Sequence, residues 1–156
     1  MIKLFAMDVD GTLTDGKINI SETGEIFKSF NVKDGLGIKL LIENNILPVI
    51  ITGRESKIVL NRAKELKITH VYQNIQDKKN FLINLCKKLD ISLDEVGYIG
   101  DDLNDLDVLK CVKNSYAPHD SMGKVLSEVK YVCSHNGGEG AVREAIDDVL
   151  ETNKGG

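Results

Sequence analysis

Short apolar runs alternate with amphipathic stretches along most of the chain. The runs are continuous, as is typical of strands buried on both faces, and we interpret four of them as strands: Ile2–Met7, Leu47–Thr52, Val71–Tyr72 and Val96–Ile99. The other stretches repeat apolar residues at helical spacing, which predicts helices at Gly35–Asn44, Glu55–Leu66, Asp77–Leu89 and Glu139–Leu150. Strands that alternate with helices predict right-handed β–α–β units, and therefore an α/β fold with a Rossmann-like, doubly wound parallel sheet.

One segment breaks this alternation after the first predicted strand. Polar and apolar residues alternate in Lys17–Ile20 and, more loosely, in Glu25–Lys28, while Ser21–Gly24 between them can form a turn. This pattern predicts a small β-hairpin insertion within Lys17–Phe30. The insertion is too short to be a separate cap domain, so we expect one domain over residues 1–152 and a flexible tail at 153–156.

Composition and charge narrow the possible partners. Of the 156 residues, 42% are hydrophobic and 28% charged, which suits a single folded domain. The net charge is −4 and no long basic tract occurs, so neither nucleic acid nor a membrane is an expected partner. No apolar run is long enough to cross a bilayer. The three cysteines are widely spaced and form no CxxC pair, which favours reduced thiols and a cytoplasmic location.

An acidic motif follows the first predicted strand. Asp8 and Asp10 are two residues apart, so on an extended chain they face the same side at the carboxyl end of that strand. Open α/β sheets bind their ligands at this edge. Two carboxylates so close repel each other unless a cation or a shared proton compensates, and Mg²⁺ prefers oxygen ligands. A solvated acidic turn is the simpler alternative, because Asp and Gly are common turn residues.

Further polar groups follow the other predicted strands. Thr52-Gly53-Arg54 could bind a phosphate at the start of a helix, or Thr52 could simply cap that helix. Lys78 begins the third long helix, where a lysine is usually solvated. A second acidic cluster follows the strand at Val96–Ile99, in which Asp102 or Asp105 could cap the next helix. Because these signals recur at one edge of the sheet, turn chemistry alone is a poor explanation for all of them.

Taken in order, these motifs resemble the haloacid dehalogenase superfamily of phosphatases. The motifs are DVDGT at residues 8–12, ITGR at 51–54, a lysine at 78 and GDDLND at 100–105. More narrowly, residues 30–39, the helix from the TGR motif to Arg62, and residues 137–144 resemble the 3-deoxy-D-manno-octulosonate 8-phosphate phosphatases. Close relatives of that group act on nine-carbon sugar-acid 9-phosphates. The resemblance implies a Mg²⁺ cofactor and a small sugar-acid phosphate as substrate.

The resemblance also implies a role for each matching position. Asp8 would be the nucleophile and a Mg²⁺ ligand, and Asp10 the general acid/base with its backbone carbonyl on the metal. Thr52 and Lys78 would hold the phosphoryl group, and Asp101 would be the third protein contact to Mg²⁺. The implied substrate contacts are Asp10, Asn31, Val32, Lys33, Asp34, Gly35, Lys39, Gly53, Arg54, Arg62 and Lys78.

The residue types support the same chemistry independently. A phosphate monoester is a dianion, so an attacking carboxylate needs the neutralisation that Mg²⁺, Lys78 and backbone N–H groups could provide. Attack by Asp8 on phosphorus would give an aspartyl-phosphate. Asp10 could give a proton to the leaving sugar oxygen and later take one from water. Cationic side chains such as Lys39 and Arg62 suit a substrate that also carries a carboxylate.

Several alternatives stay open. A response-regulator-like switch also groups Asp, Thr and Lys around Mg²⁺, although such receivers place the acidic pair and the phosphoacceptor on different strands. A non-catalytic oligomerisation or regulatory domain is the other rival, and the intact set of catalytic residue types speaks against it. Within the phosphatase interpretation, Glu55 stands where typical octulosonate enzymes are expected to carry a basic residue, so a nonulosonate 9-phosphate remains an alternative substrate.

A site without a cap needs walls from elsewhere, and the hairpin suggests a source. It carries Ile18, Ile20, Ile26 and Phe27, and a lone two-stranded ribbon gains from packing against a partner. We therefore expect a homo-oligomer. The resemblance implies a homotetramer, in which we expect Gly137–Arg143 to lie near the active site of a neighbouring subunit.

Overall fold

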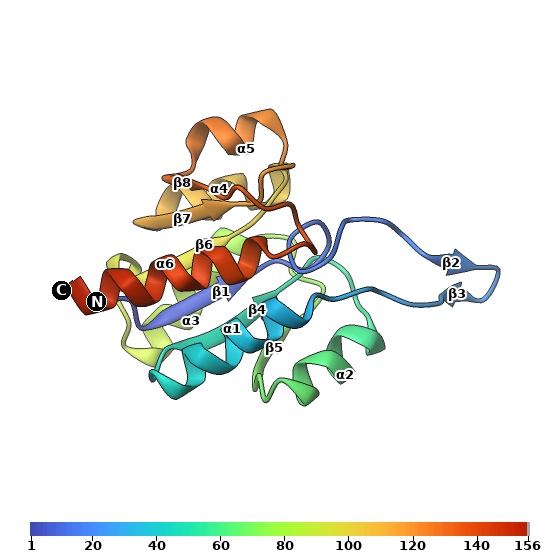
Figure 1. Cartoon of the computed structure of the whole chain (residues 1–156), viewed down its shortest axis with the longest axis horizontal. Coiled ribbons are helices and arrows are strands. Elements are labelled where there is room, and N and C mark those ends of the chain that lie inside the picture. The colour runs from blue at the N-terminus through green and yellow to red at the C-terminus, as the bar shows by residue number, and fades with distance from the viewer. Residues whose placement is uncertain (156) are drawn as a thin grey trace.

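A six-stranded parallel sheet forms the centre of the protein, in the order β5–β4–β1–β6–β7–β8. The computed structural model describes residues 1–155 (Figure 1). The strands of the sheet are β1 (Leu4–Met7), β4 (Leu47–Ile51), β5 (His70–Tyr72), β6 (Val96–Ile99), β7 (Asn114–Ala117) and β8 (Tyr131–Val132). The helices are α1 (Val32–Glu43), α2 (Lys57–Glu65), α3 (Lys78–Leu89), α4 (Leu103–Cys111), α5 (Gly123–Glu128) and α6 (Ala141–Gly155), with a short 3-10 helix η1 (Leu93–Glu95). The predicted Rossmann-like α/β fold is confirmed.

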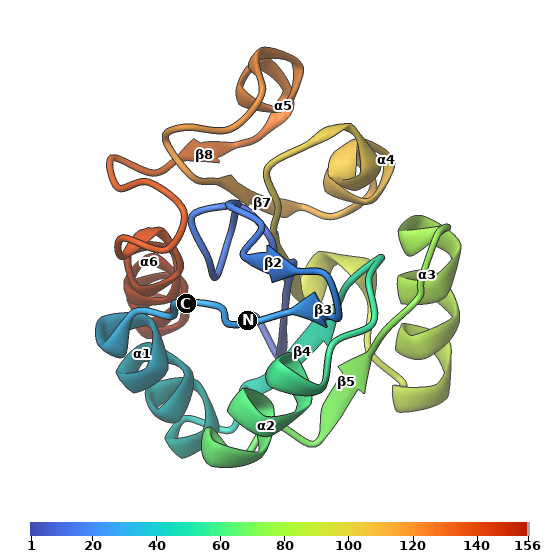
Figure 2. The ribbon, with the colours of Figure 1, turned by 90° about the vertical axis from the view of Figure 1, so that its right-hand side faces the viewer.

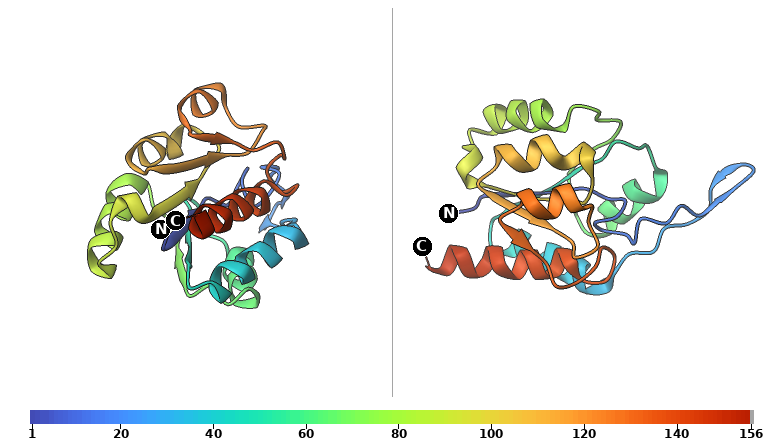
Figure 3. Two further views of the ribbon diagram at one scale, coloured as in Figure 1. Left: turned by 60° about the vertical axis from the view of Figure 1, so that its left-hand side comes forward. Right: turned by 90° about the horizontal axis from the view of Figure 1, so that it is seen from above.

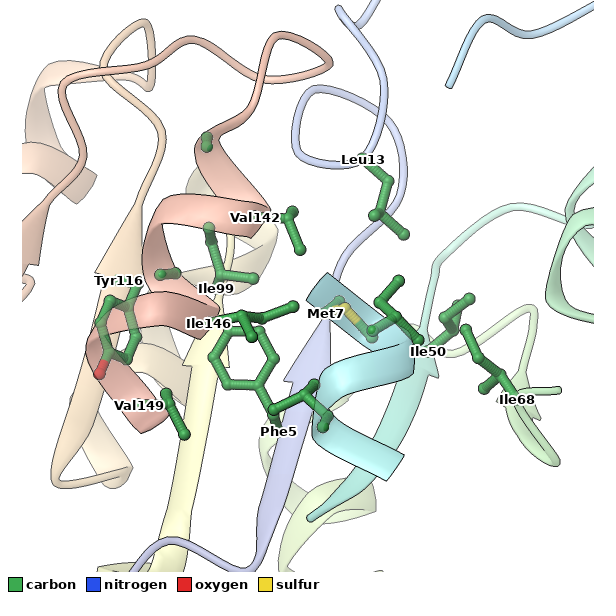
Figure 4. Close-up of a cluster of buried hydrophobic side chains, with 14 of the residues drawn as sticks. Phe5, Met7, Leu13, Ile50, Ile68, Ile99, Tyr116, Val142, Ile146 and Val149 are labelled. Atoms are coloured by element: carbon green, nitrogen blue, oxygen red, sulfur yellow. The ribbon is translucent and has the colours of Figure 1, made fainter. Parts of the chain in front are cut away.

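Alternation along β1 explains the two layers of helices. Phe5 and Met7 point to the face covered by α1, α2 and α6, whereas Leu4 and Ala6 point to the face covered by α3, α4 and α5 (Figure 2). Figure 4 shows buried side chains on the face of Phe5 and Met7, where residues of β1, β4 and β6 pack against those of α6. Both faces of the sheet are therefore buried, and its parallel strands end together at one edge.

The predicted hairpin is present but shorter than the pattern suggested. Its strands are only β2 (Ile20–Ser21) and β3 (Gly24–Glu25), extended by one bond from the Ile26 N–H to the Asn19 carbonyl at 2.8 Å. The hairpin projects well beyond the body of the molecule (Figures 1 and 3). Within residues 1–155, this hairpin is the only insertion between β1 and α1, and no separate cap domain is present.

The C-terminal segment differs from the expected flexible tail. Helix α6 continues to Gly155, and the Asn153 side chain accepts from the Ile2 N–H at 2.7 Å and donates to the Ile2 carbonyl at 2.9 Å. These two bonds tie Asn153 to Ile2 just before β1, so the N- and C-terminal ends of the described chain lie together (Figure 3). Gly156 lies outside the described residues.

Two helix starts differ from the apolar pattern because side chains cap the first turns. Helix α1 begins at Val32 because the Asn31 side chain accepts from the Lys33 N–H at 2.8 Å. Helix α2 begins at Lys57, capped by Ser56 rather than by Thr52. Thr52 is therefore not used as the helix cap. No helix within residues 1–155 is both long and apolar enough to cross a membrane.

Candidate active site

The carboxyl ends of β1, β4 and β6 meet at one edge of the sheet, where the chain forms a pocket of about 260 Å³. Asp8 directly follows β1, Thr52 directly follows β4, and Asp101 follows β6 after one glycine. Adjacent parallel strands, whose ends lie side by side in Figure 2, thus bring together residues that are far apart in the sequence. The pocket is lined by Asp8, Asp10, Gly16, Thr52, Gly53, Arg54, Asp101, Asp102 and Asn104.

Lys78 forms the buried centre of this edge. It is the first residue of α3, and its side chain is only 1% exposed. Its Nζ donates to Asp8 Oδ1 at 2.9 Å and to Asp105 Oδ1 at 2.8 Å. Burial alone would lower the pKa of Lys78, but the two carboxylates outweigh it and raise that pKa. Lys78 is therefore a fixed positive charge beside the Asp8 carboxylate.

Asp105 positions Lys78. It is fully buried, and its Oδ1 also accepts from the Tyr98 hydroxyl at 2.7 Å. Its Oδ2 accepts from the backbone N–H groups of Asp101 at 3.1 Å and Asp102 at 3.5 Å. Carboxylate oxygens of Asp8, Asp101 and Asp105 lie within 4.8 Å of one another, a spacing that could hold a metal ion. Because both oxygens of Asp105 already accept bonds, Asp8 and Asp101 are the two carboxylates left to face a cation.

The charges of Asp8 and Asp101 fit a hard divalent cation. Burial, and next the neighbouring Asp105, raises the pKa of Asp8 well above its ordinary value. Burial likewise raises the pKa of Asp101 to about 6. Gly11 leaves the approach to Asp101 open, since a Cβ there would lie 1.9 Å from Asp101 Oδ2. An all-oxygen site of this kind suits Mg²⁺ and would remove the repulsion between the two carboxylates.

Asp10 lies at the mouth of the pocket between two cations. Lys28 donates to Asp10 Oδ1 at 2.6 Å, and Arg54 Nη1 is 4.0 Å from Asp10 Oδ2. Lys28 also pairs with Glu25 at 3.0 Å, and Glu25 in turn accepts from the Ser56 hydroxyl. Sequence reasoning missed Lys28, because a lysine in a hairpin arm carries no motif and its partner Asp10 lies in another loop.

Two of the predicted substrate contacts, Asn31 and Asp34, form hydrogen bonds to other parts of the same chain. Asn31 donates from its side-chain amide to the Gly138 carbonyl at 3.3 Å. Asp34 is only 2% exposed, and its Oδ1 accepts from the Arg143 N–H at 2.9 Å. The Asp34 carboxylate thus joins the first turns of α1 and α6, so its side chain serves the fold rather than the pocket.

The remaining predicted contacts lie on a separate surface of the same chain. Val32, Gly35, Lys39 and Arg62 help line a groove of about 550 Å³ between α1 and α2. Arg62 stacks over the Phe30 ring at 5.6 Å from its centroid. Within the described chain, these side chains and the exposed Lys33 do not line the pocket that contains Asp8.

The glycine-rich loop before α6 packs against the acidic motif. The Gly138 N–H donates to the Thr12 carbonyl at 3.1 Å, and Gly138 has a φ of +74°. A Cβ on Gly137 would come 1.9 Å from the Gly11 carbonyl oxygen. The close backbone approach therefore requires glycine and supports the loop that follows Asp10.

A parallel sheet with two aspartates after its first strand, a buried lysine on the first of them and a second acidic loop is the arrangement of a hydrolase built on a Rossmann-like fold. Consistent with this, a family model described as haloacid dehalogenase-like hydrolase matches residues 68–146. The chain belongs to this family, within the group of 3-deoxy-D-manno-octulosonate 8-phosphate phosphatases, as the following relatives show.

The relatives are similar over nearly the whole chain. The 3-deoxy-D-manno-octulosonate 8-phosphate phosphatase of Escherichia coli K12 is 42% identical over 96% of this chain and 79% of its own length. That of Yersinia pestis is 44% identical over 96% of this chain and 80% of its own length. A crystal structure of the Moraxella catarrhalis phosphatase, in complex with magnesium, phosphate and 3-deoxy-D-manno-octulosonate (KDO), is 43% identical. It covers 96% of this chain and 86% of that one with a TM-score of 0.93.

Proposed function

We propose that residues 1–152 form a single, capless phosphatase domain that hydrolyses 3-deoxy-D-manno-octulosonate 8-phosphate with Mg²⁺ as cofactor. The observation that carries this proposal is the buried pair of Lys78 and Asp8 beside Asp101, with Thr52 and Asp10 at the same pocket. The identity to phosphatases of that name supports the choice of substrate. The buried Lys78 between two carboxylates also supports a functional interpretation of the acidic motif over a solvated turn, because a turn on the surface would leave these charges in water.

The proposed reaction has two half-steps. An Asp8 carboxylate oxygen bonds to phosphorus while the bond from phosphorus to the sugar oxygen breaks, and Asp10 gives a proton to that oxygen. Water then bonds to phosphorus, loses a proton to Asp10, and displaces Asp8 with release of inorganic phosphate. Lys78 and Thr52 hold the phosphoryl oxygens. Mg²⁺, held by Asp8, Asp101 and the Asp10 carbonyl, would supply charge neutralisation for the phosphoryl group.

Phosphate release from a panel of purified sugar-acid phosphates tests this proposal. We expect the eight-carbon 8-phosphate to have the highest kcat/KM, with no release when excess chelator is present. A panel in which no phosphomonoester is hydrolysed, with Mg²⁺ supplied, would contradict the phosphatase assignment. A strong preference for a nine-carbon 9-phosphate would leave the chemistry intact and change only the substrate.

One observation keeps the nine-carbon substrate as the second candidate. Glu55 follows the Thr52-Gly53-Arg54 segment and accepts from the Asn74 side chain at 3.0 Å. Glu55 thus puts a negative charge next in sequence to Arg54, which lines the pocket, where the resemblance leads us to expect a positive one. Replacement of Glu55 by Lys should raise the relative kcat/KM for the eight-carbon substrate if this position sets the preference.

We also propose that the chain works as a homotetramer. Ile18, Ile20, Ile26 and Phe27 on the projecting hairpin are all about half or more exposed, which is unusual for a monomer's surface. A partner over the hairpin would also supply a wall for the open pocket. Light scattering should give a tetramer mass, and Ile20→Asn together with Ile26→Asn should lower both that mass and the activity; an active wild-type monomer would contradict the idea.

A cytoplasmic location belongs to the same proposal. The cysteines Cys86, Cys111 and Cys133 form no disulfide, and burial raises the pKa of each thiol. Unpaired, protonated thiols suit a reducing compartment. Cell fractionation tests this location directly.

A further inference from the structure

The foot of the hairpin carries a lysine that is bound to the proposed acid/base. The Lys28 side chain is only 4% exposed, although its neighbours Phe27 and Ser29 are exposed. Its ammonium group donates to Asp10 Oδ1 at 2.6 Å and pairs with Glu25 at 3.0 Å. A lysine is rarely so buried unless its charge is paired, so this side chain is held by specific contacts rather than by chance.

The contacts of Lys28 extend to the helix that follows the phosphate-binding segment. Glu25 accepts from the Ser56 hydroxyl, and Ser56 caps α2. Hydrogen bonds from Ser56 and Lys28 outweigh the effect of burial and lower the pKa of Glu25, so Glu25 stays charged. The chain Asp10–Lys28–Glu25–Ser56 thus connects the pocket, the hairpin and α2 through paired groups.

A structural role alone would need only part of this network. The Glu25–Lys28 pair would suffice to brace the hairpin, and Ser56 caps α2 without Lys28. The bond to Asp10 is additional, and it is made to one oxygen of a carboxyl group whose other oxygen is within 4.0 Å of Arg54. A carboxyl group held at one oxygen cannot turn freely, so its second oxygen keeps a fixed direction.

We propose that Lys28 is a positioning residue for the reaction: it holds Asp10 by Oδ1 so that Oδ2 exchanges the proton. This inference rests on the proposed function. In the first half-step, the proton on Oδ2 passes to the leaving sugar oxygen as the phosphorus–oxygen bond breaks. In the second, the attacking water returns a proton to Oδ2 as it bonds to phosphorus. The hairpin thereby contributes to catalysis within its own chain, in addition to any packing against a partner.

The leaving group of the substrate provides a readout that separates positioning from general damage. A sugar phosphate releases a poor leaving group that needs a proton, whereas p-nitrophenyl phosphate releases one that does not. Replacement of Lys28 by Met keeps the chain length but removes the charge. We expect Lys28→Met to lower kcat/KM for the sugar-acid phosphate about 10- to 100-fold and that for p-nitrophenyl phosphate less than about 3-fold, in the same direction as Asp10→Asn.

Matched variants complete the experiment. Lys17→Met removes an exposed lysine from the other arm and should change neither rate. Lys28→Arg should restore most of the activity toward the sugar-acid phosphate. Glu25→Gln removes the brace but leaves the Asp10 contact, so it should shift the ratio of the two rates far less than Lys28→Met. Light scattering and thermal unfolding of each variant check assembly and folding; should Lys28→Met fail to fold, Lys28→Gln gives the same comparison.

The outcomes distinguish this inference from the proposed function. Equal losses on both substrates, or a shift with Glu25→Gln as large as that with Lys28→Met, would show that Lys28 only supports the hairpin. No loss on either substrate in Lys28→Met, with an active wild type and an inactive Asp8→Asn, would overturn the positioning role alone. A wild type without phosphatase activity would remove the proposed function and this inference together.

Discussion

Asp34 is the buried carboxyl group whose effect on stability can be worked out most directly. Its Oδ1 accepts from the Arg143 N–H, while its Oδ2 is buried without a hydrogen-bond partner within residues 1–155. Burial raises the pKa of Asp34 from 3.8 to about 6, against the opposing effects of the Arg143 N–H and of Arg62. A protonated Asp34 therefore suits the folded protein better than an ionised one.

The sign of the pH effect follows from proton binding. Between pH 3.8 and about 6 the folded state holds a proton on Asp34 that the unfolded state has lost. Stability from this group is thus highest at low pH and is lost as the pH rises through the folded pKa. Each unit of pKa difference corresponds to about 1.4 kcal/mol, so the full effect is roughly 3 kcal/mol. Roughly 1 kcal/mol of it disappears between pH 5 and pH 8.

The perturbation is Asp34→Asn, which keeps an oxygen to accept from Arg143 but cannot ionise. Urea unfolding at a fixed protein concentration, at several pH values from 5 to 8, gives the free energy of unfolding of each protein. We expect the wild type to lose roughly 1 kcal/mol relative to Asp34→Asn across that range. Asp107→Asn, an exposed substitution on α4, is the control and should run parallel to the wild type. Parallel curves for the wild type and Asp34→Asn would refute the reasoning.

Three further predictions concern the pocket. Asp8→Asn should abolish phosphate release, measured colorimetrically, and leave thermal unfolding cooperative; near wild-type turnover would rule out Asp8 as the nucleophile. Excess chelator should stop turnover and added Mg²⁺ restore it, with Asp101→Asn needing a higher Mg²⁺ concentration in a titration; activity that persists in chelator would argue against the cofactor. Gly137→Ala should lower both activity and melting temperature, because its Cβ would meet the Gly11 carbonyl, whereas Gly123→Ala, which meets nothing within 4 Å, should not; equal behaviour of the two variants would contradict the packing argument.

The sequence predicted the parts of the fold that depend on local pattern. The strands around Met7, Ile51 and Ile99 are continuous apolar runs, and they were predicted to within two residues at each end. The polar residues that follow them were expected at one edge, because parallel strands end together. The catalytic and metal-binding roles of these polar residues were inferred from the resemblance, and they remain predictions.

Elements stabilised by distant partners were not predictable in this way. Strand β7 begins with Asn114 and Ser115, which have low strand propensity, yet both are buried. The Asn114 side chain donates to the carbonyl of Val96, and the Ser115 hydroxyl accepts from the Lys130 N–H. These partners become neighbours only when the sheet has formed. The contact of Lys28 with the pocket was not predictable for the same reason, because its partner is the carboxylate of Asp10, 18 residues earlier in the sequence.

The charges around the pocket explain why a metal ion and a phosphate ester belong together there. Lys78 lies between Asp8 and Asp105 and can offset only one of their two charges, and Lys28 offsets that of Asp10 while it also pairs with Glu25. Arg54 also lies 4.0 Å from Asp10, but Asp101 has no cation within ion-pair distance in the described chain, so this edge keeps excess negative charge in a partly buried place. A phosphate dianion would be repelled by such a surface. A divalent cation held by Asp8 and Asp101 would reverse that repulsion, so we expect substrate binding to depend on Mg²⁺ as strongly as the chemical step does.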